Sequence, residues 1–461
     1  MFDRKNRLSA KNITALFMSK NVLIVDSGLK NLGGHNFSYT RAVQSALARK
    51  GFAVTVFANR NLSGELVKNT GYHPVFSFGA YDYPPGVGKL RDLQYLYAQS
   101  VIYSHELEQA FKHLVKDEPA LIFCHTVNDF ELIGWKRFLS RHHLSGKLVV
   151  LMRYTPRFHS CSWLKTKLHP YWRIRPHYLN SLHSRMKGKF VLVTDSEPLT
   201  EDYATIFPHQ MITLPIPINE YILSAEEQDF AAAGVCARYG LGQVDRIRLG
   251  YVGDARDAKG FPLLPGLVRR ILSDTNLNVE FVIQCPGAAS GVENGQLPEG
   301  VEELLALAKQ AENRITLIQE KLSESDYAEL IRALDIVLVP YRLTGYVEPT
   351  SGIFAEAVAL AKPVVVPAGT WMARELQKSG GGVEFQSGDE ADLAEKVKTL
   401  VQNFAVYADK ARHFSSQWKT FHNSHSLAEM LIQQIWQEKN MAETGVQRNP
   451  VSQQEIIESN E

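Results

Sequence analysis

Short apolar runs alternate with amphipathic helical patterns along most of the chain. The run NVLIVD at 21–26 is followed by a glycine-containing loop, a helical pattern from Phe37 to Arg49 and a second apolar run at 53–58. Strand, loop, helix and strand in this order form a βαβ unit, and repetition of that unit builds a parallel sheet. Further strands are predicted at 120–124, 147–152, 190–195 and 212–215.

The same order of patterns starts again after residue 246. The apolar run IRLGYVG at 247–253 leads through a glycine loop into the helical pattern LLPGLVRRIL and a strand at 279–284. Strands are also predicted at 314–319, 335–340 and 363–367, with helices at 324–333 and 353–361. The fold class is therefore α/β, with two Rossmann-like domains.

The predicted domain organisation follows from these two series. It consists of an N-terminal extension 1–16, a first domain 17–222 with a basic segment 132–194, a linker 223–246, a second domain 247–425, a C-terminal helix 426–440 that crosses back and a disordered tail 441–461. At 461 residues the chain is too long for one compact core and has the length of two domains with tails.

The composition narrows the class of protein. Apolar residues make up 45% and charged residues 21%, which is ordinary for a soluble globular protein, and no apolar run has the length needed to cross a bilayer. The cysteines Cys124, Cys161, Cys236 and Cys285 are far apart and form no CxxC pair. This pattern argues against a disulfide framework and a zinc site. We expect the cytoplasm as the location, with peripheral attachment to the inner face of the membrane.

The first motif is GYVGDARDAKGF at 250–261, where a predicted strand enters a glycine-rich turn that opens a helix. Backbone N–H groups at a helix start attract anions, and the side chains of Arg256 and Lys259 can complete a pyrophosphate clamp. The alternative is a surface turn with solvated cations. The motif is not GxGxxG, so a dinucleotide oxidoreductase has little support.

The second motif lies in PYRLTGYVEPTSGIFAEAVALAKPVVVP at 340–367. Glu348 is in the loop after a strand, Thr350-Ser351-Gly352 begins a helix, and Glu356 is within that helix. N–H groups and hydroxyls at such a junction can hold a diphosphate, and each carboxylate can bind a pair of sugar hydroxyls. The alternative is an ordinary N-cap followed by a solvated glutamate.

These two motifs resemble the donor domain of the GT-B glycosyltransferases, in particular the retaining enzymes of glycosyltransferase family 4. The matching residues are Gly253, Lys259-Gly260, Glu348, Glu356 and Lys362-Pro363-Val364-Val365. The resemblance implies that Lys259 neutralises the donor phosphates, Glu356 binds the nucleotide ribose and Glu348 lies against the transferred sugar. It also implies GT-B architecture, with the two domains facing a cleft.

The chain departs from the family pattern at two places. Asp254 stands where the family most often has an arginine, and Arg256 is the candidate substitute. Pro349-Thr350-Ser351 stands where the family usually has Gly-Phe-Gly.

The first half resembles the same family through fewer residues. Gly33-Gly34 resembles the paired glycines that follow the family's first strand, and His125 in LIFCHT resembles a histidine that the family places near the reactive sugar. The alternative for His125 is a strand-end residue that caps backbone groups. The likeness extends over most of residues 20–425.

One stretch of the chain is strongly basic. No Asp or Glu occurs between Glu131 and Asp195, although the net charge of the whole chain is only +1. Cations near an anionic leaflet contribute about 1 kcal/mol each, and interfacial Trp and Tyr add anchoring. We interpret the stretch as a surface for an anionic membrane or an anionic acceptor. The residues assigned to it are Arg153, Lys165, Lys167, Trp172, Arg173 and Arg175.

Two other interpretations of the basic stretch stay open, a solvated face and a site for single-stranded nucleic acid. No nucleic-acid-binding motif accompanies the charge, so no nucleic-acid partner is expected.

Together these patterns predict a glycosyltransferase that moves a sugar from a nucleoside diphosphate sugar to a glycan or lipid-linked acceptor, with retention. The catalytic candidates are His125, Lys259 and Glu348. The donor-binding candidates are Gly33, Gly34, Gly253, Arg256, Lys259, Glu348, Thr350, Ser351, Gly352 and Glu356. No cofactor is expected, and no metal either, because no DxD-type motif lies near the site. The alternatives are a nucleotide-sugar epimerase of the same fold and a catalytically inactive glycan- or membrane-binding module.

Overall fold

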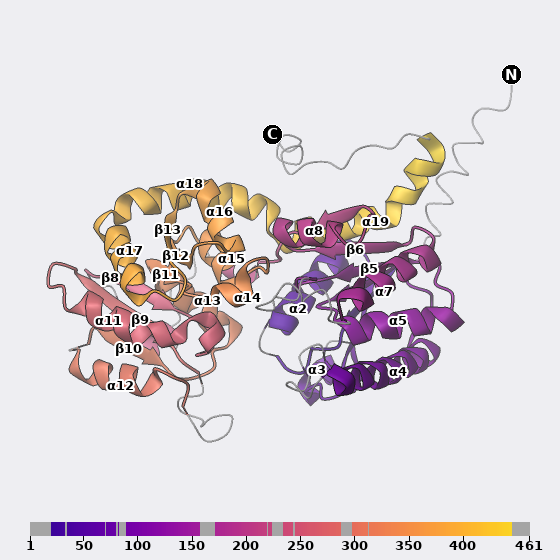
Figure 1. The fold of residues 1–461 in the computed structure, drawn as a ribbon, viewed down its shortest axis with the longest axis horizontal. Coiled ribbons are helices and arrows are strands. Elements are labelled where there is room, and N and C mark those ends of the chain that lie inside the picture. The colour runs from indigo at the N-terminus through magenta and orange to yellow at the C-terminus, as the bar shows by residue number, and fades with distance from the viewer. Residues whose placement is uncertain are drawn as a thin grey trace. The chain divides into compact units, whose positions relative to one another are not determined.

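The structure is a computed structural model that describes residues 20–32, 35–69, 71–79, 82, 89–156, 171–218, 220–223, 234–242, 245–286, 297–311 and 313–444. The chain divides into two compact units, Met1–Leu214 with Leu427–Glu461, and Pro215–Ser426 (Figure 1). The extension 1–16, half of the linker 223–246 and most of the tail 441–461 lie outside the described residues.

The first unit is built on a parallel sheet with the order β3-β2-β1-β4-β5-β6-β7. Its strands are β1 (Asn21–Asp26), β2 (Ala53–Asn59), β3 (Tyr72–Phe76), β4 (Leu121–His125), β5 (Lys147–Leu151), β6 (Phe190–Thr194) and β7 (Met211–Thr213). All neighbouring pairs in this sheet are parallel. The strand order reverses between β1 and β4, which is the topological switch point of a doubly wound sheet.

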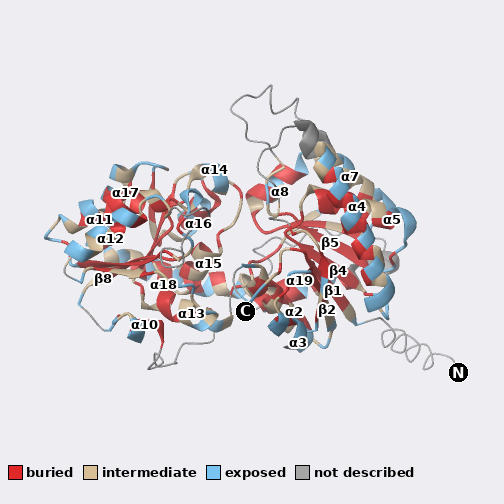
Figure 2. Ribbon diagram, turned by 90° about the horizontal axis from the view of Figure 1, so that it is seen from below, coloured by how far each residue is buried: buried red, intermediate tan, exposed pale blue. Residues whose placement is uncertain are grey.

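Helices cover both faces of this sheet. Its helices are α2 (His35–Arg49), α3 (Gly64–Asn69), α4 (Lys89–Leu114), α5 (Asp129–Arg141), α7 (Tyr171–Met186), α8 (Glu197–Ala204) and α19 (Ser424–Thr444). One core contains residues of α4, α5 and α7, and a second core contains residues of α2 and α19, including Leu427 and Leu431. The central strands β1, β4, β5 and β6 are almost wholly buried between these two cores (Figure 2), as expected for a parallel sheet.

The second unit repeats this architecture with the order β10-β9-β8-β11-β12-β13. Its strands are β8 (Ile247–Tyr251), β9 (Val279–Gln284), β10 (Ile315–Ile318), β11 (Ile336–Leu338), β12 (Val364–Pro367) and β13 (Gly382–Phe385). The neighbouring pairs are again parallel. Here the order reverses between β8 and β11.

Two helical layers cover the second sheet. The helices are α9 (Glu220–Leu223), α10 (Val235–Arg238), α11 (Leu264–Leu272), α12 (Val301–Gln310), α13 (Glu324–Ala333), α14 (Leu343–Tyr346), α15 (Gly352–Ala359), α16 (Trp371–Ser379), α17 (Glu390–Gln402) and α18 (Phe404–Phe421), with 3₁₀ turns η1 (Asp257–Lys259) and η2 (Phe261–Leu263). Residues of α13, α15 and α16 share one core, and residues of α11 and α17 share the other.

The prediction of two Rossmann-like α/β domains is confirmed. The strands β3 and β13 were not predicted, and both lie at a sheet edge. Pro74 interrupts the pattern of β3, and an edge strand tolerates proline because one side of it needs no ladder hydrogen bond. The units divide at Pro215, ahead of the predicted linker. Among the described residues, no helix is long and apolar enough to cross a membrane.

Candidate functional site

The turn after β8 requires glycine at its first bend. Gly253 has a φ of 115°, in the left-handed region, and its N–H donates to Gln284 Oε1 at the end of β9 over 2.8 Å. A Cβ at this position would lie 2.9 Å from Lys259 Nζ and 3.0 Å from Ile353 Cδ1. The ammonium of Lys259 and the start of α15 therefore both lie against the Gly253 backbone.

Gly260 brings the same turn against β11. Its φ is 68°, and a Cβ there would lie 1.7 Å from the carbonyl oxygen of Pro340. Strands β8 and β11 are the two that flank the switch point of this sheet. Ligands of open α/β sheets bind at the carboxyl ends of strands at such a point, so the turn occupies the expected ligand position.

Lys259 is a partly buried cation in this turn. Its Nζ lies 5.9 Å from the centroid of the Tyr341 ring, just beyond β11. Burial lowers the pKa of Lys259, the charge of Asp254 raises it, and the charge of Arg256 lowers it. In the part of the chain that the structure describes, no carboxylate lies within ion-pair distance of Lys259. A desolvated cation in this state is well suited to bind an anion such as a phosphate.

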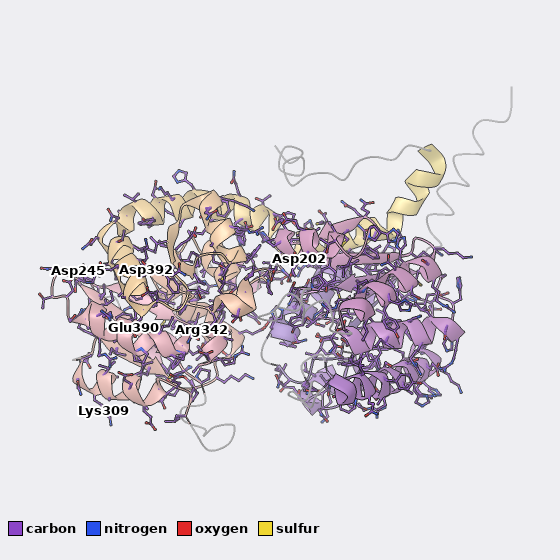
Figure 3. All side chains as sticks on the ribbon, in the orientation of Figure 1. Asp202, Asp245, Lys309, Arg342, Glu390 and Asp392 are labelled. Carbon is purple, nitrogen blue, oxygen red and sulfur yellow. The ribbon has the colours of Figure 1, made fainter. Side chains whose placement is uncertain are left out.

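Arg256 is oriented differently from Lys259. Its guanidinium pairs with Asp254 at 3.1 Å, and both side chains are about 60% exposed. Arg256, the proposed substitute, thus neutralises Asp254, which stands where the family most often has an arginine. Exposed ion pairs of this kind contribute little to stability, and their charged groups exchange partners readily. Arg342, labelled in Figure 3, pairs in turn with Asp257 at 2.8 Å.

The second motif meets the first at Tyr341. Ser351 is the N-cap of α15, and its Oγ accepts from the N–H of Phe354 over 3.3 Å. A hydrogen bond between Ser351 and Tyr341 also lowers the pKa of the tyrosine, although burial raises that pKa more strongly. Gly352 is the first residue of α15, and Glu348, ahead of it, is only 7% exposed. The structure therefore brings the two predicted motifs together.

Glu356 is engaged within the protein rather than solvated. Its Oε2 accepts from the hydroxyl of Tyr327 over 2.5 Å. Burial raises the pKa of Glu356 to about 7, and the hydrogen bond from Tyr327 opposes that shift. Sequence reasoning missed Tyr327, because its place on the helix 324–333 gives no sign of which residue it faces.

In the first unit, His125 ends β4 and is part of a buried polar network. Its Nε2 lies 2.7 Å from Thr40 Oγ1 and 3.0 Å from Asp26 Oδ2, and its Nδ1 lies 3.2 Å from Thr126 Oγ1. Asp26, at the end of β1, also accepts from Asn36 Nδ2 over 2.8 Å. His125 and Asp26 thus meet at the switch point of the first sheet. Both ring nitrogens of His125 have protein partners, which fix the ring.

The same network corrects the assignment of Arg153 to an exposed basic surface. Arg153 pairs with Asp195 at 3.1 Å, and their side chains are 11% and 1% exposed. Its guanidinium lies 4.5 Å from the centroid of the Tyr39 ring, which is 4.7 Å from the ring of His125. Arg153 therefore belongs to the polar cluster at the carboxyl edge of the first sheet.

Arg175 is also a structural residue rather than part of an exposed surface. It binds Asp129 through two hydrogen bonds of 2.8 and 3.1 Å and donates to the carbonyl of Thr155 over 2.8 Å. This pairing raises the pKa of Arg175 further above its ordinary value, against the effect of burial. Gly33, Gly34, Lys165 and Lys167 lie outside the described residues, as do the side chains of Trp172 and Arg173.

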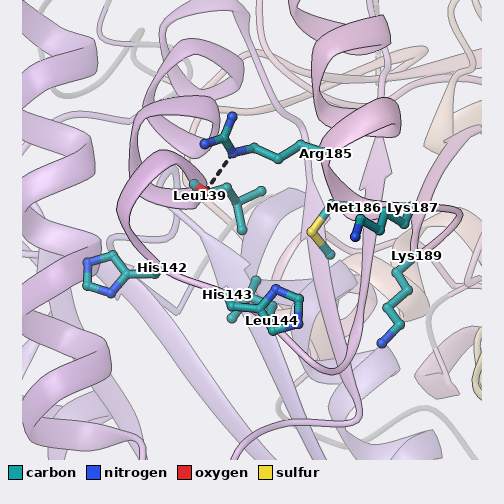
Figure 4. Close-up of a pocket in the computed structure, with 8 residues that line it drawn as sticks. All are labelled: Leu139, His142, His143, Leu144, Arg185, Met186, Lys187 and Lys189. Atoms are coloured by element: carbon teal, nitrogen blue, oxygen red, sulfur yellow. Dashed lines mark hydrogen bonds between the residues drawn. The ribbon is translucent and has the colours of Figure 1, made fainter.

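Acids from other parts of the chain neutralise some of the acid-free stretch. Arg141, for example, pairs with Glu108 of α4 at 2.7 Å. A small pocket of about 80 Å³ keeps a basic lining (Figure 4). It is lined by Leu139, His142, His143, Leu144, Arg185, Met186, Lys187 and Lys189. These residues precede β5 and β6, so the pocket is at the amino edge of the sheet, away from the switch point. Within the described ranges, no cluster of His, Cys, Asp or Glu could hold a metal ion.

The family comparison concerns the second unit. Residues 246–403 match the model of the family described as glycosyl transferases group 1. This range contains both motifs and all of the second sheet. No curated protein matches the chain by sequence.

Solved structures match both units. Sucrose-phosphate synthase from Thermosynechococcus elongatus is 14% identical, with a TM-score of 0.63 over 92% of this chain and 99% of that one. WaaG, a glycosyltransferase involved in lipopolysaccharide biosynthesis, is 14% identical, with a TM-score of 0.56 over 89% and 99%. HepE from Anabaena, in complex with UDP-glucose, is 15% identical, with a TM-score of 0.56 over 90% and 99%.

Identities this low show the fold, while the family model concerns the residues that build the predicted donor site. The chain therefore has the GT-B fold of these solved structures, and its residues 246–403 are similar to the glycosyl transferases group 1 family.

Proposed function

We propose that this protein transfers a sugar from a nucleoside diphosphate sugar to a glycan or lipid-linked acceptor, with retention of the anomeric configuration and without a metal ion. The observation that carries the proposal is Lys259, a partly buried cation with no carboxylate partner in the described chain, at the switch point of the second sheet. Glu348 and Glu356 flank the start of α15, which meets the same turn.

In this proposal the donor's anomeric carbon–oxygen bond breaks and its electron pair leaves with the nucleoside diphosphate. Lys259 and the N–H groups at the start of α15 stabilise the charge that grows on the departing oxygen. The acceptor hydroxyl attacks from the face that the diphosphate leaves, which retains the configuration, and its proton passes to the departing phosphate. His125 is the residue of the first unit that we propose to lie near the reactive sugar. Both of its ring nitrogens have protein partners, so the ring is held in one orientation.

A uridine nucleotide is the first donor to test. HepE was solved with UDP and with UDP-glucose, and this chain has the same fold. The proposal extends to UDP sugars on that ground, with GDP and ADP sugars as the comparison, because the shape of the base pocket decides the choice.

A panel of UDP, GDP and ADP sugars is expected to contain one donor that raises the melting temperature of the full chain by several degrees. A ligand at 100 times its dissociation constant stabilises the folded state by about 2.7 kcal/mol. Because the site uses cations in place of a metal, the same shift should appear with EDTA as with magnesium. A shift that requires magnesium would refute the metal-independent part of the proposal, and no shift with any donor would refute the donor site.

We also propose that the basic segment attaches the protein to the anionic inner face of a membrane, which is where a lipid-linked acceptor would be presented. The proposal now rests on Lys165, Lys167, Trp172 and Arg173, because Arg153 and Arg175 are paired within the first unit. Screening by salt acts over about 8–10 Å at physiological ionic strength, so attachment of this kind weakens as salt rises.

In vesicle co-sedimentation, we expect more protein to pellet with anionic than with neutral lipid, and less as salt is raised. The double change of Lys165 and Lys167 to Glu should lower the pelleted fraction at least severalfold, since each cation contributes about 1 kcal/mol. The matched control is the same change at Lys309 and Lys321, two exposed lysines of the second unit. Equal recovery with both lipids would show that the segment does not bind membranes.

A further inference from the structure

The carboxylate of Glu356 is held by a residue that belongs to neither motif. Tyr327 on α13 donates its hydroxyl to Glu356 Oε2 on α15, with 2.5 Å between the oxygens. The contact joins two helices that share one core of the second unit. The carboxylate at this contact, that of Glu356, is the one that we propose to bind the nucleotide ribose.

Few charged groups face this pair. The charge of Glu324 on α13 raises the pKa of Glu356. Tyr341, beyond β11, raises the pKa of Tyr327. The helix α18, which also packs on α15, instead binds backbone carbonyls there through Ser415 and Trp418. Across the described ranges, no cation lies within ion-pair distance of Glu356. The Tyr327 hydroxyl is therefore the group that stabilises the ionised carboxylate.

The protonation state of Glu356 decides what it can bind. An ionised carboxylate accepts hydrogen bonds through both oxygens, whereas the protonated acid uses one oxygen as a donor. Burial raises the pKa of Glu356 to about 7, Tyr327 opposes that shift and Glu324 adds to it. A donor to the charged form favours that form, so without the tyrosine hydroxyl Glu356 would be protonated up to a higher pH.

We propose that Tyr327 is a positioning residue for nucleotide binding, whose hydroxyl holds the Glu356 carboxylate in the ionised form that can accept from the two hydroxyls of a ribose. This inference rests on the proposed function, since it takes the ligand of Glu356 to be a ribonucleoside diphosphate. Affinity for the nucleotide then rises with pH as Glu356 ionises. Tyr327 sets the pH at which this rise occurs.

The test is the dissociation constant of UDP for the wild type and Tyr327→Phe, measured by calorimetry from pH 6 to pH 9. GDP and ADP serve as probes if UDP does not bind. The variant is expected to bind about tenfold more weakly at pH 6 and within about twofold at pH 9. Raising the pKa of Glu356 lowers its ionised fraction at a pH below that pKa and leaves the fraction nearly unchanged at a pH well above it. The terminal phosphate of UDP titrates near pH 6 in both experiments, so it cancels in the comparison.

Two further proteins separate positioning from a structural effect. Tyr407→Phe removes a hydroxyl from α18 of the same unit and should follow the wild type at every pH. In a Glu356→Gln background, which cannot ionise, adding Tyr327→Phe should change the dissociation constant by less than about twofold. An equal loss at pH 6 and pH 9, or a loss that persists in the Gln background, would overturn the inference alone. Failure of the wild type to bind any of the three nucleotides would overturn the proposed function itself.

Discussion

Lys259→Ala is expected to lower turnover under saturating donor by about 10²–10³-fold, the loss found when one preorganised donor to a developing negative charge is removed. Lys259 lies in the turn that follows β8 and packs against the end of β11, and the described chain supplies it with no carboxylate. Its charge is therefore available to the departing diphosphate. The effect should appear in turnover more than in nucleotide affinity, because the charge on the leaving oxygen grows as the bond breaks.

The same change should leave the melting temperature unchanged or slightly raised. Burial lowers the pKa of Lys259 in the folded state. A lysine whose folded pKa is below its unfolded value opposes folding at neutral pH, where the unfolded chain binds the proton more tightly. Removing it relieves that cost. Lys309→Ala, at an exposed position of the same unit, is the matched control and should change neither quantity.

Arg256→Ala provides a graded comparison. Because Arg256 is exposed and paired with Asp254, its loss should reduce turnover less than the loss of Lys259 does. If Lys259→Ala kept wild-type turnover while Arg256→Ala did not, the phosphate would lie on the outer side of the turn and the assignment of Lys259 would be wrong.

Glu356→Ala is expected to weaken nucleotide binding by about 1.5–3 kcal/mol, the value of hydrogen bonds to a charged group. This corresponds to a rise of roughly 10- to 150-fold in the dissociation constant. The carboxylate is partly buried and already oriented by Tyr327, so little ordering is needed when it accepts the ribose hydroxyls. Calorimetric titration of UDP at pH 8, above the pKa of Glu356, measures the full effect.

The control for this change is Glu395→Ala on α17, an exposed glutamate of the same unit. It should bind UDP as the wild type does. A folded Glu356→Ala protein with unchanged affinity would mean that the ribose is held elsewhere, and the spacing of Glu348 and Glu356 would lose its functional meaning.

The sequence predicted the parts of the molecule whose signal is local. Buried parallel strands are continuous apolar runs, so the central strands of both sheets could be placed, whereas the edge strands β3 and β13 carry Pro74 or a short run after glycines. Lys259 and Glu356 could be assigned because fixed spacings connect each to a strand end or a helix start. The structure shows that the turn that contains Lys259 and the helix that contains Glu356 meet.

What could not be predicted depends on contacts between distant positions. His125 meets Thr40 and Asp26 only because β1 and β4 are neighbours in the sheet. The acid-free stretch looked like one basic surface, but Arg153 and Arg175 point to Asp195 and Asp129. The charges along a sequence do not indicate in which direction each side chain points. The contact between Tyr327 and Glu356 could not be predicted either, because it joins two separate helices.

The most direct test of the donor site is the release of nucleoside diphosphate from the donor that stabilises the protein, measured without an acceptor. When water replaces the acceptor hydroxyl, we predict slow release of the nucleoside diphosphate by the wild type, and release at least a hundredfold slower by Lys259→Ala, within the range of losses cited for an oxyanion donor. Release by Lys259→Ala at the wild-type rate, or no release by a wild-type protein that binds the donor, would contradict the assignment of this turn as the site of sugar transfer.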